Sequence, residues 1–233
     1  MQETSRATTG EGTLPRARSA SVPLEQRKER CLAWTSEDRT LRLFLAGLLP
    51  EALQAAVFSA LTAARRAACQ ARWVRPGQMH VTLAFFGETA AADVPSLTEA
   101  VRAVAPQHGP ARLSLQGVGC FGRPHQPSVL FAELAGEVAA LSALEADVRR
   151  AVGPVRRATA AEQAFHPHLT LARAQGRHGD AALARCLRAL RAQGFGDFVL
   201  DRLSLLESRL LPTGSLYTPL SEFPLGRAPV LQA

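Results

Sequence analysis

Cysteine, lysine and long apolar runs are scarce in this sequence, and each scarcity excludes a class of protein. The four cysteines lie far apart, at positions 31, 69, 120 and 186, which argues against a zinc site or a disulfide-stabilised fold. No apolar run reaches the roughly 20 residues that cross a bilayer, so no membrane association is expected. The N-terminus lacks the apolar centre of a secretory signal, and we therefore expect a cytoplasmic protein.

Positive charge is in excess, and arginine carries almost all of it. The formal net charge is +7, and Lys28 is the only lysine. A guanidinium group can bind two phosphate oxygens at once, and excess positive charge attracts anionic ligands. The composition is compatible with an anionic partner, although an arginine- and alanine-rich sequence is also typical of some genomes.

The first part of the chain differs from the rest in composition. Residues 1–39 are rich in Ser, Thr, Gly, Pro, Arg and Glu without a steady hydrophobic period, and we expect a flexible tail there. Residues 40–228 are long enough and apolar enough to form one folded domain with its own core.

Segments with strand and helix periodicity alternate through this domain. The expected strands are 41–48, 79–87, 111–121, 128–134, 165–172, 198–208 and 215–223. The expected helices begin after Pro50, cover 94–104 and 138–152, and lie near 181–192. Helices together with antiparallel-looking strand pairs predict an α+β fold. The order of elements contains a rough internal duplication, so two related lobes would bring equivalent strands together at a groove.

Two of the six histidines occur in the same short motif. His80-Val-Thr82-Leu and His168-Leu-Thr170-Leu each place a histidine two residues before a threonine inside an apolar segment. Side chains two apart on a strand share a face, so each strand presents one imidazole beside one hydroxyl. If the two strands flank one groove, two imidazoles and two hydroxyls surround a common point.

Such a point could support hydrolysis of a phosphodiester. One imidazole would accept a proton from water, and the other would donate a proton to the leaving oxygen. An ordinary histidine pKa near 6.5 allows one ring to be neutral and the other protonated at neutral pH. The hydroxyls of Thr82 and Thr170 can donate hydrogen bonds to the non-bridging oxygens. This chemistry requires no metal or other cofactor, and the sequence shows no carboxylate cluster to hold one.

Other roles compete with this interpretation. A single His-x-Thr on a strand is more often structural than catalytic, and the duplication of the motif is what favours catalysis. His166 shares the face of His168 by strand alternation, so the two could instead be a metal-ligand pair, although the spacing offers no third ligand.

The motifs and their surroundings resemble the two-histidine (2H) phosphoesterase superfamily, and most closely its RNA 2′,3′-cyclic phosphodiesterase (2′-5′ RNA ligase) branch. The resemblance rests on "RLFLAGLLPE", "WVRPGQMHVTLAFFGE", "FHPHLTLAR" and "LSLLESRLLPTGSLYTPL". It implies a bilobal α+β fold, with an antiparallel sheet and helices in each pseudo-symmetric lobe and the active-site groove between the lobes. It also implies metal-independent hydrolysis of a terminal 2′,3′-cyclic phosphate on RNA to a 2′-phosphate, and weak, reversible 2′-5′ ligation.

The resemblance also suggests roles for individual residues. His168 is expected to be the general base toward water, and His80 the general acid toward the 3′ oxygen. Arg173 is expected to contact phosphate, but strict alternation places it on the face of Leu171, so the strand must end or bulge there. His166 stands where many relatives are expected to have arginine, so it either replaces one donor toward the substrate by another or weakens the grip on a longer RNA.

Two aromatic residues are candidates for stacking a terminal base. These are Phe44 and Tyr217, with core packing as the alternative for Phe44. The competing functions are hydrolysis of small cyclic phosphates or 2′-5′-linked oligoadenylates, and RNA binding without catalysis. We expect a monomer that acts on RNA ends or on nucleotides with a 2′,3′-cyclic phosphate.

Overall fold

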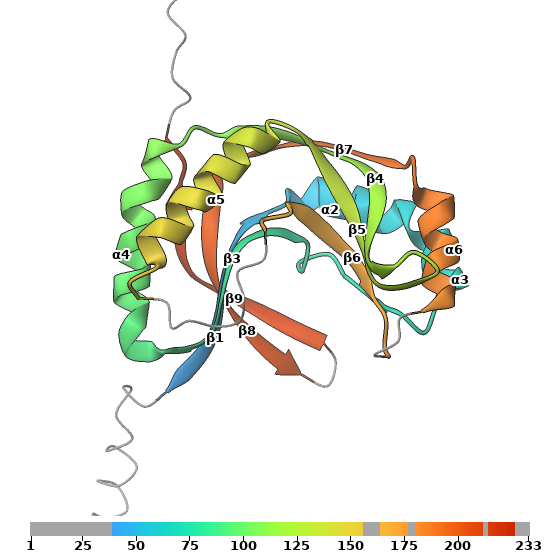
Figure 1. Cartoon of the computed structure of the whole chain (residues 1–233), viewed down its shortest axis with the longest axis horizontal. Helices are drawn as coiled ribbons and strands as arrows, with labels where there is room; N and C mark the ends of the chain where they lie inside the picture. The colour runs from blue at the N-terminus through green and yellow to red at the C-terminus, as the bar shows by residue number, and fades with distance from the viewer. Residues whose placement is uncertain (1–38, 156–163, 177–179, 212–213, 227–233) are drawn as a thin grey trace, which may run out of the picture. The chain divides into compact units, whose positions relative to one another are not determined.

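The computed structural model describes residues 39–155, 164–176, 180–211 and 214–226 (Figure 1). All of these lie in one compact unit, residues 36–233. The tail expected at 1–39 falls outside the described residues except for Arg39. In chain order the elements are β1 (Thr40–Leu48), α2 (Glu51–Ala60), α3 (Thr62–Ala67), β2 (Arg72–Trp73), β3 (His80–Ala90), η2 (Ala91–Asp93), α4 (Val94–Val104), η3 (Ala105–Gln107), β4 (Ala111–Arg123), β5 (Gln126–Gly136), α5 (Val138–Val152), β6 (His168–Arg173), α6 (Ala181–Leu190), β7 (Gly194–Leu200), β8 (Arg202–Leu211) and β9 (Gly214–Pro224).

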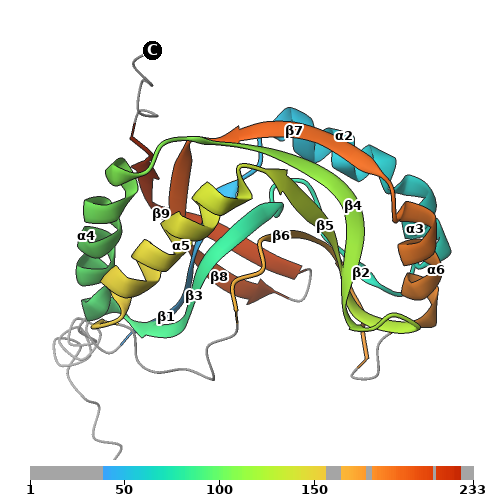
Figure 2. The same cartoon turned by 45° about the horizontal axis from the view of Figure 1, so that its top comes forward.

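The described strands join in one antiparallel sheet with two halves. Its order is β7-β4-β5-β6-β3-β1-β8-β9, with β2 paired to β6 beside this path. β3 and β6, which carry the two His-x-Thr motifs, meet in the middle through the single pair Val81–Leu169. On one side lie β1, β8 and β9, and on the other lie β5, β4 and β7 (Figures 1 and 2). The predicted α+β fold with two lobes is confirmed.

Two of the described helices connect the lobes. α2 follows β1 but packs against β7 of the other lobe, and α5 follows β5 and packs against both β4 of the same lobe and β3 of the other. α4 lies along α5, and α6 packs against β5 and β4 (Figure 2). The side chain of Asp180 begins α6 by accepting a hydrogen bond from the backbone N–H of Ala182 at 2.6 Å.

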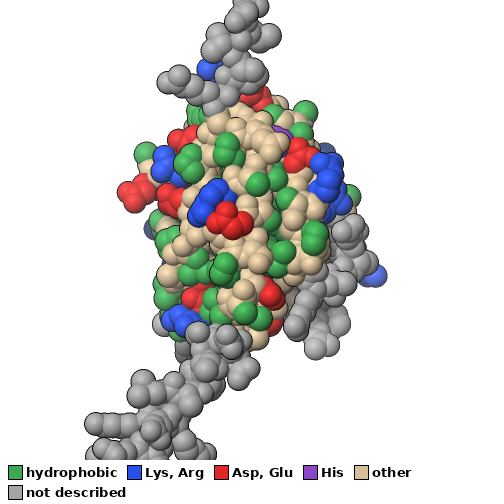
Figure 3. All heavy atoms as spheres, turned by 90° about the vertical axis from the view of Figure 1, so that its left-hand side faces the viewer, with side chains coloured by type: hydrophobic (Ala, Val, Ile, Leu, Met, Phe, Trp, Pro, Cys, Tyr) green, Lys and Arg blue, Asp and Glu red, His purple; other side chains and the backbone are tan. Residues whose placement is uncertain are grey.

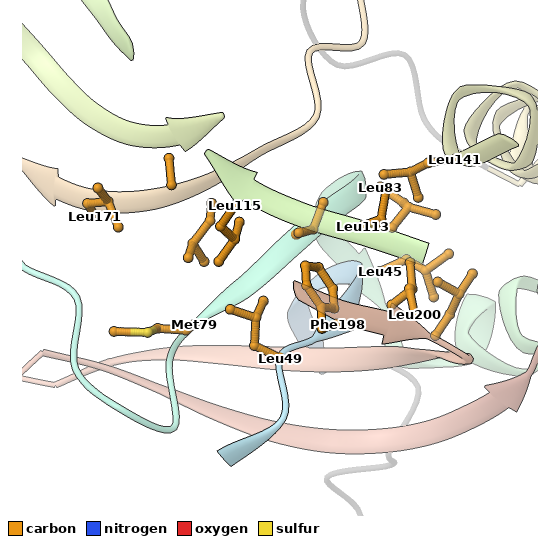
Figure 4. Packing of buried hydrophobic residues seen from close by; sticks show 14 of the residues in the cluster. Leu45, Leu49, Met79, Leu83, Leu113, Leu115, Leu141, Leu171, Phe198 and Leu200 are labelled. Atoms are coloured by element: carbon orange, nitrogen blue, oxygen red, sulfur yellow. The ribbon is translucent and has the colours of Figure 1, made fainter. Parts of the chain in front are cut away.

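One hydrophobic core runs through both lobes. It contains Leu45 and Leu83 from the β1–β3 half together with Leu115 and Leu171 from the β4–β6 half (Figure 4). All four side chains are at most 4% exposed. Burial of apolar side chains is the main stabilising term of folding. Because both lobes contribute side chains to this one core, each lobe stabilises the other.

The strand expected at 198–208 proves to be two strands. β7 ends at Leu200 and pairs with β4, whereas β8 begins at Arg202 and pairs with β1. The chain passes from one lobe to the other at Asp201, between the buried residues Leu200 and Leu203. Because the residues on both sides of Asp201 include buried leucines, the hydrophobic pattern continues from β7 into β8. The sequence therefore shows no sign that one strand ends and another begins.

The surface beside α4 mixes charges of both signs with hydrophobic side chains (Figure 3). Arg102 pairs with Glu99 on α4 at 2.6 Å, and Arg150 pairs with Asp147 on α5 at 2.6 Å. Positive charge is therefore neutralised locally on these helices. Among the described helices, none is long and apolar enough to cross a membrane.

Candidate active site

The strand register brings the two His-x-Thr motifs together. Because Val81 pairs with Leu169 in antiparallel register, His80 lies opposite Thr170, and Thr82 lies opposite His168. Val81 and Leu169 are at most 1% exposed and face the core. The imidazoles and hydroxyls therefore share the opposite face of the sheet, and each histidine lies diagonally across from the other.

Both imidazole rings are held in the same orientation by the backbone. His80 Nδ1 lies 2.8 Å from the carbonyl oxygen of Gln78, and His168 Nδ1 lies 2.7 Å from the carbonyl oxygen of His166. A carbonyl oxygen can only accept, so Nδ1 carries the hydrogen in both rings. The Nε2 atoms are thereby left for proton transfer, as a base when neutral and as an acid when protonated.

His80 lies in an aromatic environment formed by β1 and β9. Its ring centroid is 4.9 Å from that of Phe44 and 5.2 Å from that of Tyr217. Phe44 is only 4% exposed, which favours core packing over base stacking for this ring. Its ring packs against His80 and Tyr217 instead, which is the core-packing alternative. Tyr217 is partly exposed and remains a candidate for base stacking.

His168 has its own aromatic neighbours, which sequence reasoning missed. Its ring centroid is 5.0 Å from that of Phe121 and 5.2 Å from that of Phe131. His166 precedes β6 and its ring centroid lies 6.0 Å from that of His168, next to the same two phenylalanines. The signal available in the sequence was the period-2 spacing of Gly117, Gly119 and Phe121 in β4.

Phe131 can adopt its position because the facing residue is a glycine. Gly119 pairs with Phe131, and a Cβ atom at 119 would lie 2.6 Å from the ring carbons of Phe131. This distance is far below van der Waals contact, so any side chain at 119 would displace the ring that packs against His168.

Burial lowers the pKa of both histidines. Desolvation is the main cause for His80, whose pKa falls to about 4, and nearby Arg173 and His168 lower it further. Desolvation also lowers the pKa of His168, followed by the charges of His166 and Arg173. In each ring the hydrogen bond to a backbone carbonyl raises the pKa but does not outweigh burial. Both rings are therefore mainly neutral at neutral pH without a ligand.

A β-bulge interrupts β6 directly after its motif. β5 pairs Phe131 with Thr170 but Leu130 with Ala172, so Leu171 is an extra residue on β6. Leu171 and Ala172 are consecutive and both fully buried, which strict alternation would not allow. The bulge thus resets which face the following residue occupies.

The bulge places Arg173 on the face of the histidines. Arg173 pairs with Val129, which shares a face with Phe131 two residues later on β5. Its charge lowers the pKa of both His80 and His168, so the guanidinium group lies near both rings. The sequence analysis required a bulge or a strand end for this placement, and the structure has the bulge.

The first motif is followed by the same irregularity. β1 pairs Ala46 with Thr82 but Leu45 with Ala84, so Leu83 is the extra residue on β3. Leu83 and Leu171 occupy equivalent positions in the two motifs, three residues after each histidine. The internal duplication therefore extends to the irregularities of the strands.

Phe85 is the counterpart of Arg173 in the first motif. It pairs with Phe44 on the histidine face of the sheet and is 46% exposed, which is high for a phenylalanine in a sheet. The guanidinium carbon of Arg42 lies 5.2 Å from the centre of its ring. One end of the site thus has a cation, and the other has an exposed aromatic ring that the sequence analysis did not single out.

Gln78 connects the loop before His80 to the β8–β9 hairpin. Its side-chain nitrogen donates to the carbonyl oxygen of Ser215 at 2.6 Å, and its side-chain oxygen accepts from the backbone N–H of Arg75 at 3.1 Å. Its carbonyl oxygen accepts the hydrogen bond from His80. Gln78 therefore positions His80 relative to the hairpin that carries Tyr217.

The described residues do not form a metal-binding group around His166 and His168. Within the described ranges, no three His, Cys, Asp or Glu side chains gather to hold a metal ion. Neither His166 nor His168 lies in such a group, and the Nδ1 atom of His168 is already bonded to a backbone carbonyl.

This fold and site have counterparts among known proteins. The sequence model described as the 2′-5′ RNA ligase superfamily matches residues 49–210. The chain belongs to the 2′-5′ RNA ligase superfamily. It is 33% identical over 191 residues to the RNA 2′,3′-cyclic phosphodiesterase of Thermus thermophilus, an alignment that covers 79% of this chain and 90% of the relative.

One further relative and one solved structure extend the comparison. The RNA 2′,3′-cyclic phosphodiesterase of Methanothermobacter thermautotrophicus is 27% identical over 187 residues, covering 79% of this chain and 99% of the relative. A crystal structure from Thermus thermophilus matches with a TM-score of 0.66 at 30% identity, covering 80% of this chain and 99% of that chain. The part of the chain that matches the 2′-5′ RNA ligase superfamily contains both motifs and Arg173, but neither Phe44 nor Tyr217.

Proposed function

We propose that this protein is an RNA 2′,3′-cyclic phosphodiesterase, which hydrolyses a terminal 2′,3′-cyclic phosphate to a 2′-phosphate. The observation that carries the proposal is the diagonal pair of histidines, each with Nδ1 bonded to a carbonyl and with Nε2 left for the substrate. A protein that only binds RNA needs positive charge and has no use for two oriented imidazoles. The related enzymes bear the name of this activity.

The reaction uses the two rings in opposite roles. His168 Nε2 accepts a proton as the water oxygen bonds to phosphorus, and His80 Nε2 donates its proton to the 3′ oxygen as the P–O3′ bond breaks. The product carries a 2′-phosphate and a free 3′-hydroxyl. His168 then holds the proton that His80 has lost, and exchange with solvent restores the starting state.

The general acid must acquire its proton together with the substrate. The pKa of His80 is about 4 in the free protein because its ring is desolvated, so few rings are protonated at neutral pH. A phosphate anion beside the ring favours its charged form and raises its pKa. Substrate binding and protonation of His80 are therefore coupled in this proposal.

The remaining polar groups stabilise the charge that develops on phosphorus. Thr82 and Thr170 can donate hydrogen bonds to the two non-bridging oxygens from opposite strands. Arg173 supplies a full positive charge to the same oxygens. His166 beside His168 and the partly exposed ring of Tyr217 complete the proposed contacts to the substrate.

The same site can run the transfer in reverse. A ribose 5′-hydroxyl in place of water would attack the cyclic phosphate and produce a 2′-5′ linkage, with the histidines in the same roles. Weak 2′-5′ ligation is thus part of the proposal. A cytoplasmic location and a monomeric state stay predictions from the sequence.

Product analysis tests the proposed function. An oligonucleotide ending in a 2′,3′-cyclic phosphate should yield the 2′-phosphate, in the presence of EDTA as well as in its absence. His80→Asn and His168→Asn keep a donor near the backbone carbonyl but remove Nε2, and each should lower turnover by about 10²- to 10⁴-fold. Val199→Ala, at an exposed position on the edge strand β7, is the matched control and should retain full activity.

Several outcomes would contradict the proposal. A 3′-phosphate product would reverse the assignment of the leaving oxygen, and activity lost in EDTA and restored by a divalent ion would favour a metal site. Normal turnover in both asparagine variants would remove the histidines from the mechanism. Turnover of 2′-5′ oligoadenylates but not of cyclic ends would favour the alternative substrate class.

A further inference from the structure

Two arginines face each other across the strands beside the site. Arg72 on β2 pairs directly with Arg173 on β6. Like charges directly opposite one another destabilise a sheet. Within the described ranges, neither guanidinium group forms an ion pair with a carboxylate. The fold thus holds two adjacent positive charges together without a neutralising partner among the described residues.

Arg72 lies on the same face of the sheet as the catalytic histidines. Directly paired residues of antiparallel strands point to the same side, and Arg173 is on the histidine face. The next residue, Trp73, points the other way, where it packs against the core and its ring N–H donates to the carbonyl oxygen of Ala68 at 3.0 Å. Arg72 is exposed, so its guanidinium group is accessible to a ligand.

The two arginines carry more positive charge than is needed to neutralise one cyclic phosphate. A cyclic phosphodiester carries a single negative charge, and Arg173, which lies near both histidines, can neutralise it. The charge of Arg72, whose partner Arg173 lies five residues after His168 on β6, is then left for a second anion. In an RNA strand the nearest second anion is the phosphodiester that joins the last two nucleotides.

We propose that Arg72 binds the phosphodiester between the terminal nucleotide and the one before it, so that the preferred substrate is a polynucleotide end. The proposal rests on the proposed function, because it assumes that the cyclic phosphate lies between His80 and His168. The RNA strand then leaves the catalytic centre along β6 toward β2, which lies on the same side of β6 as β3. Arg72 contributes to binding of the strand and takes no part in proton transfer.

Two substrates that differ by one nucleotide, and therefore by one phosphodiester, separate this role from a structural one. Adenosine 2′,3′-cyclic phosphate has only the reacting phosphate, whereas the dinucleotide ApA with a 2′,3′-cyclic phosphate end also has the second one. Arg72→Ala should lower kcat/KM for the dinucleotide by about 10-fold, the value of one hydrogen bond to a charged group. The mononucleotide should be hydrolysed at the unchanged rate.

Salt provides an independent measurement on the same proteins. Loss of one phosphate contact should reduce the slope of log kcat/KM against log salt by about 0.7 for the dinucleotide. Arg72→Lys should keep most of the slope because it keeps the charge. Arg188→Ala removes an exposed arginine from α6 and is the matched control, for which neither substrate should change.

The other possible results contradict either the role of Arg72 or the proposed function. Equal losses on both substrates in Arg72→Ala would assign Arg72 a structural role, and no loss on either would show that it makes no contact. In both cases the wild-type protein still hydrolyses cyclic phosphate, so the proposed function stands while this inference fails. If the wild-type protein hydrolyses neither substrate, the proposed function itself fails.

Discussion

At the scale of single residues, two nearly identical tetrapeptides acquire different properties. His80 and His168 share the same spacing to threonine and the same hydrogen bond from Nδ1. His80 packs against Phe44 and Tyr217 and is the more strongly desolvated, so its pKa falls to about 4. This asymmetry follows from neighbours that are distant in sequence.

The lowered pKa of His80 predicts a dependence of stability on pH. The unfolded chain binds the proton at pH values below 6.5, whereas the folded protein binds it only near pH 4, so stability falls as the pH decreases between these values. The contribution of His80 is about 3 kcal/mol over this range, from 1.36 kcal/mol per pKa unit. The free energy of unfolding in urea at pH 7, 5.5 and 4.5 measures it.

His80→Asn provides the comparison because asparagine does not titrate in this range. Its free energy of unfolding should decrease less than that of the wild-type protein between pH 7 and 4.5. Parallel curves for the two proteins would show that His80 is not desolvated as described.

At the scale of secondary structure, irregularities in the strands decide which side chains reach the site. The bulges at Leu83 and Leu171 turn Phe85 and Arg173 onto the histidine face. The missing side chain of Gly119 lets the ring of Phe131 pack beside His168. Regular strands with the same composition would bury Arg173 against the core.

Replacement of Gly119 tests this dependence. Gly119→Ala places a Cβ atom 2.6 Å from the ring of Phe131, so the ring must move and displace His168. Because a misplaced catalytic group can cost up to about 10²-fold in rate, we expect turnover to fall by about 10-fold or more. Steady-state kinetics of the variant, with circular dichroism to confirm folding, measure the effect.

A second substitution tests whether the loss of activity comes from the contact between residues 119 and 131. Leucine at 131 is smaller, so the double variant Gly119→Ala with Phe131→Leu should recover part of the lost activity. Full activity of the single variant, or a double variant as inactive as the single one, would contradict the proposed contact.

At the scale of the whole folded unit, the two lobes are joined by more than their shared strands. β3 and β6 meet through only one residue pair, which would be a weak connection by itself. The hydrophobic core is nevertheless continuous, and α2 and α5 each pack against the lobe opposite their preceding strand. The distance between the motifs is thus fixed by the packing of the entire unit.

This continuity predicts a single cooperative unfolding transition. Trp73 and Trp34 are the only tryptophans, so fluorescence of a Trp34→Phe variant reports Trp73 next to β6, while far-UV circular dichroism reports both lobes. Thermal or urea transitions followed by the two methods should coincide. Separate transitions would show that the lobes unfold independently.

The sequence alone predicted the α+β fold, most strands and helices, and the doubled His-x-Thr motif. These features depend on local periodicity, because side chains two apart on a strand share a face whatever the rest of the chain does. The prediction of a single strand over 198–208 was wrong. The hydrophobic pattern continues through Asp201, although the neighbouring strand changes from β4 to β1 there. The sequence-based prediction also missed β2, which is too short to show any period.

Tertiary structure decided the remainder of the candidate site. The sequence could state that Arg173 needed a bulge, but only pairing with β5 shows that the bulge exists. The burial of Phe44, the exposure of Phe85 and the pairing of Arg72 with Arg173 likewise depend on which strands become neighbours. Local sequence fixes which residue types alternate along a strand. Which charges and rings meet across strands is set by the register, and the register follows from burying one continuous core.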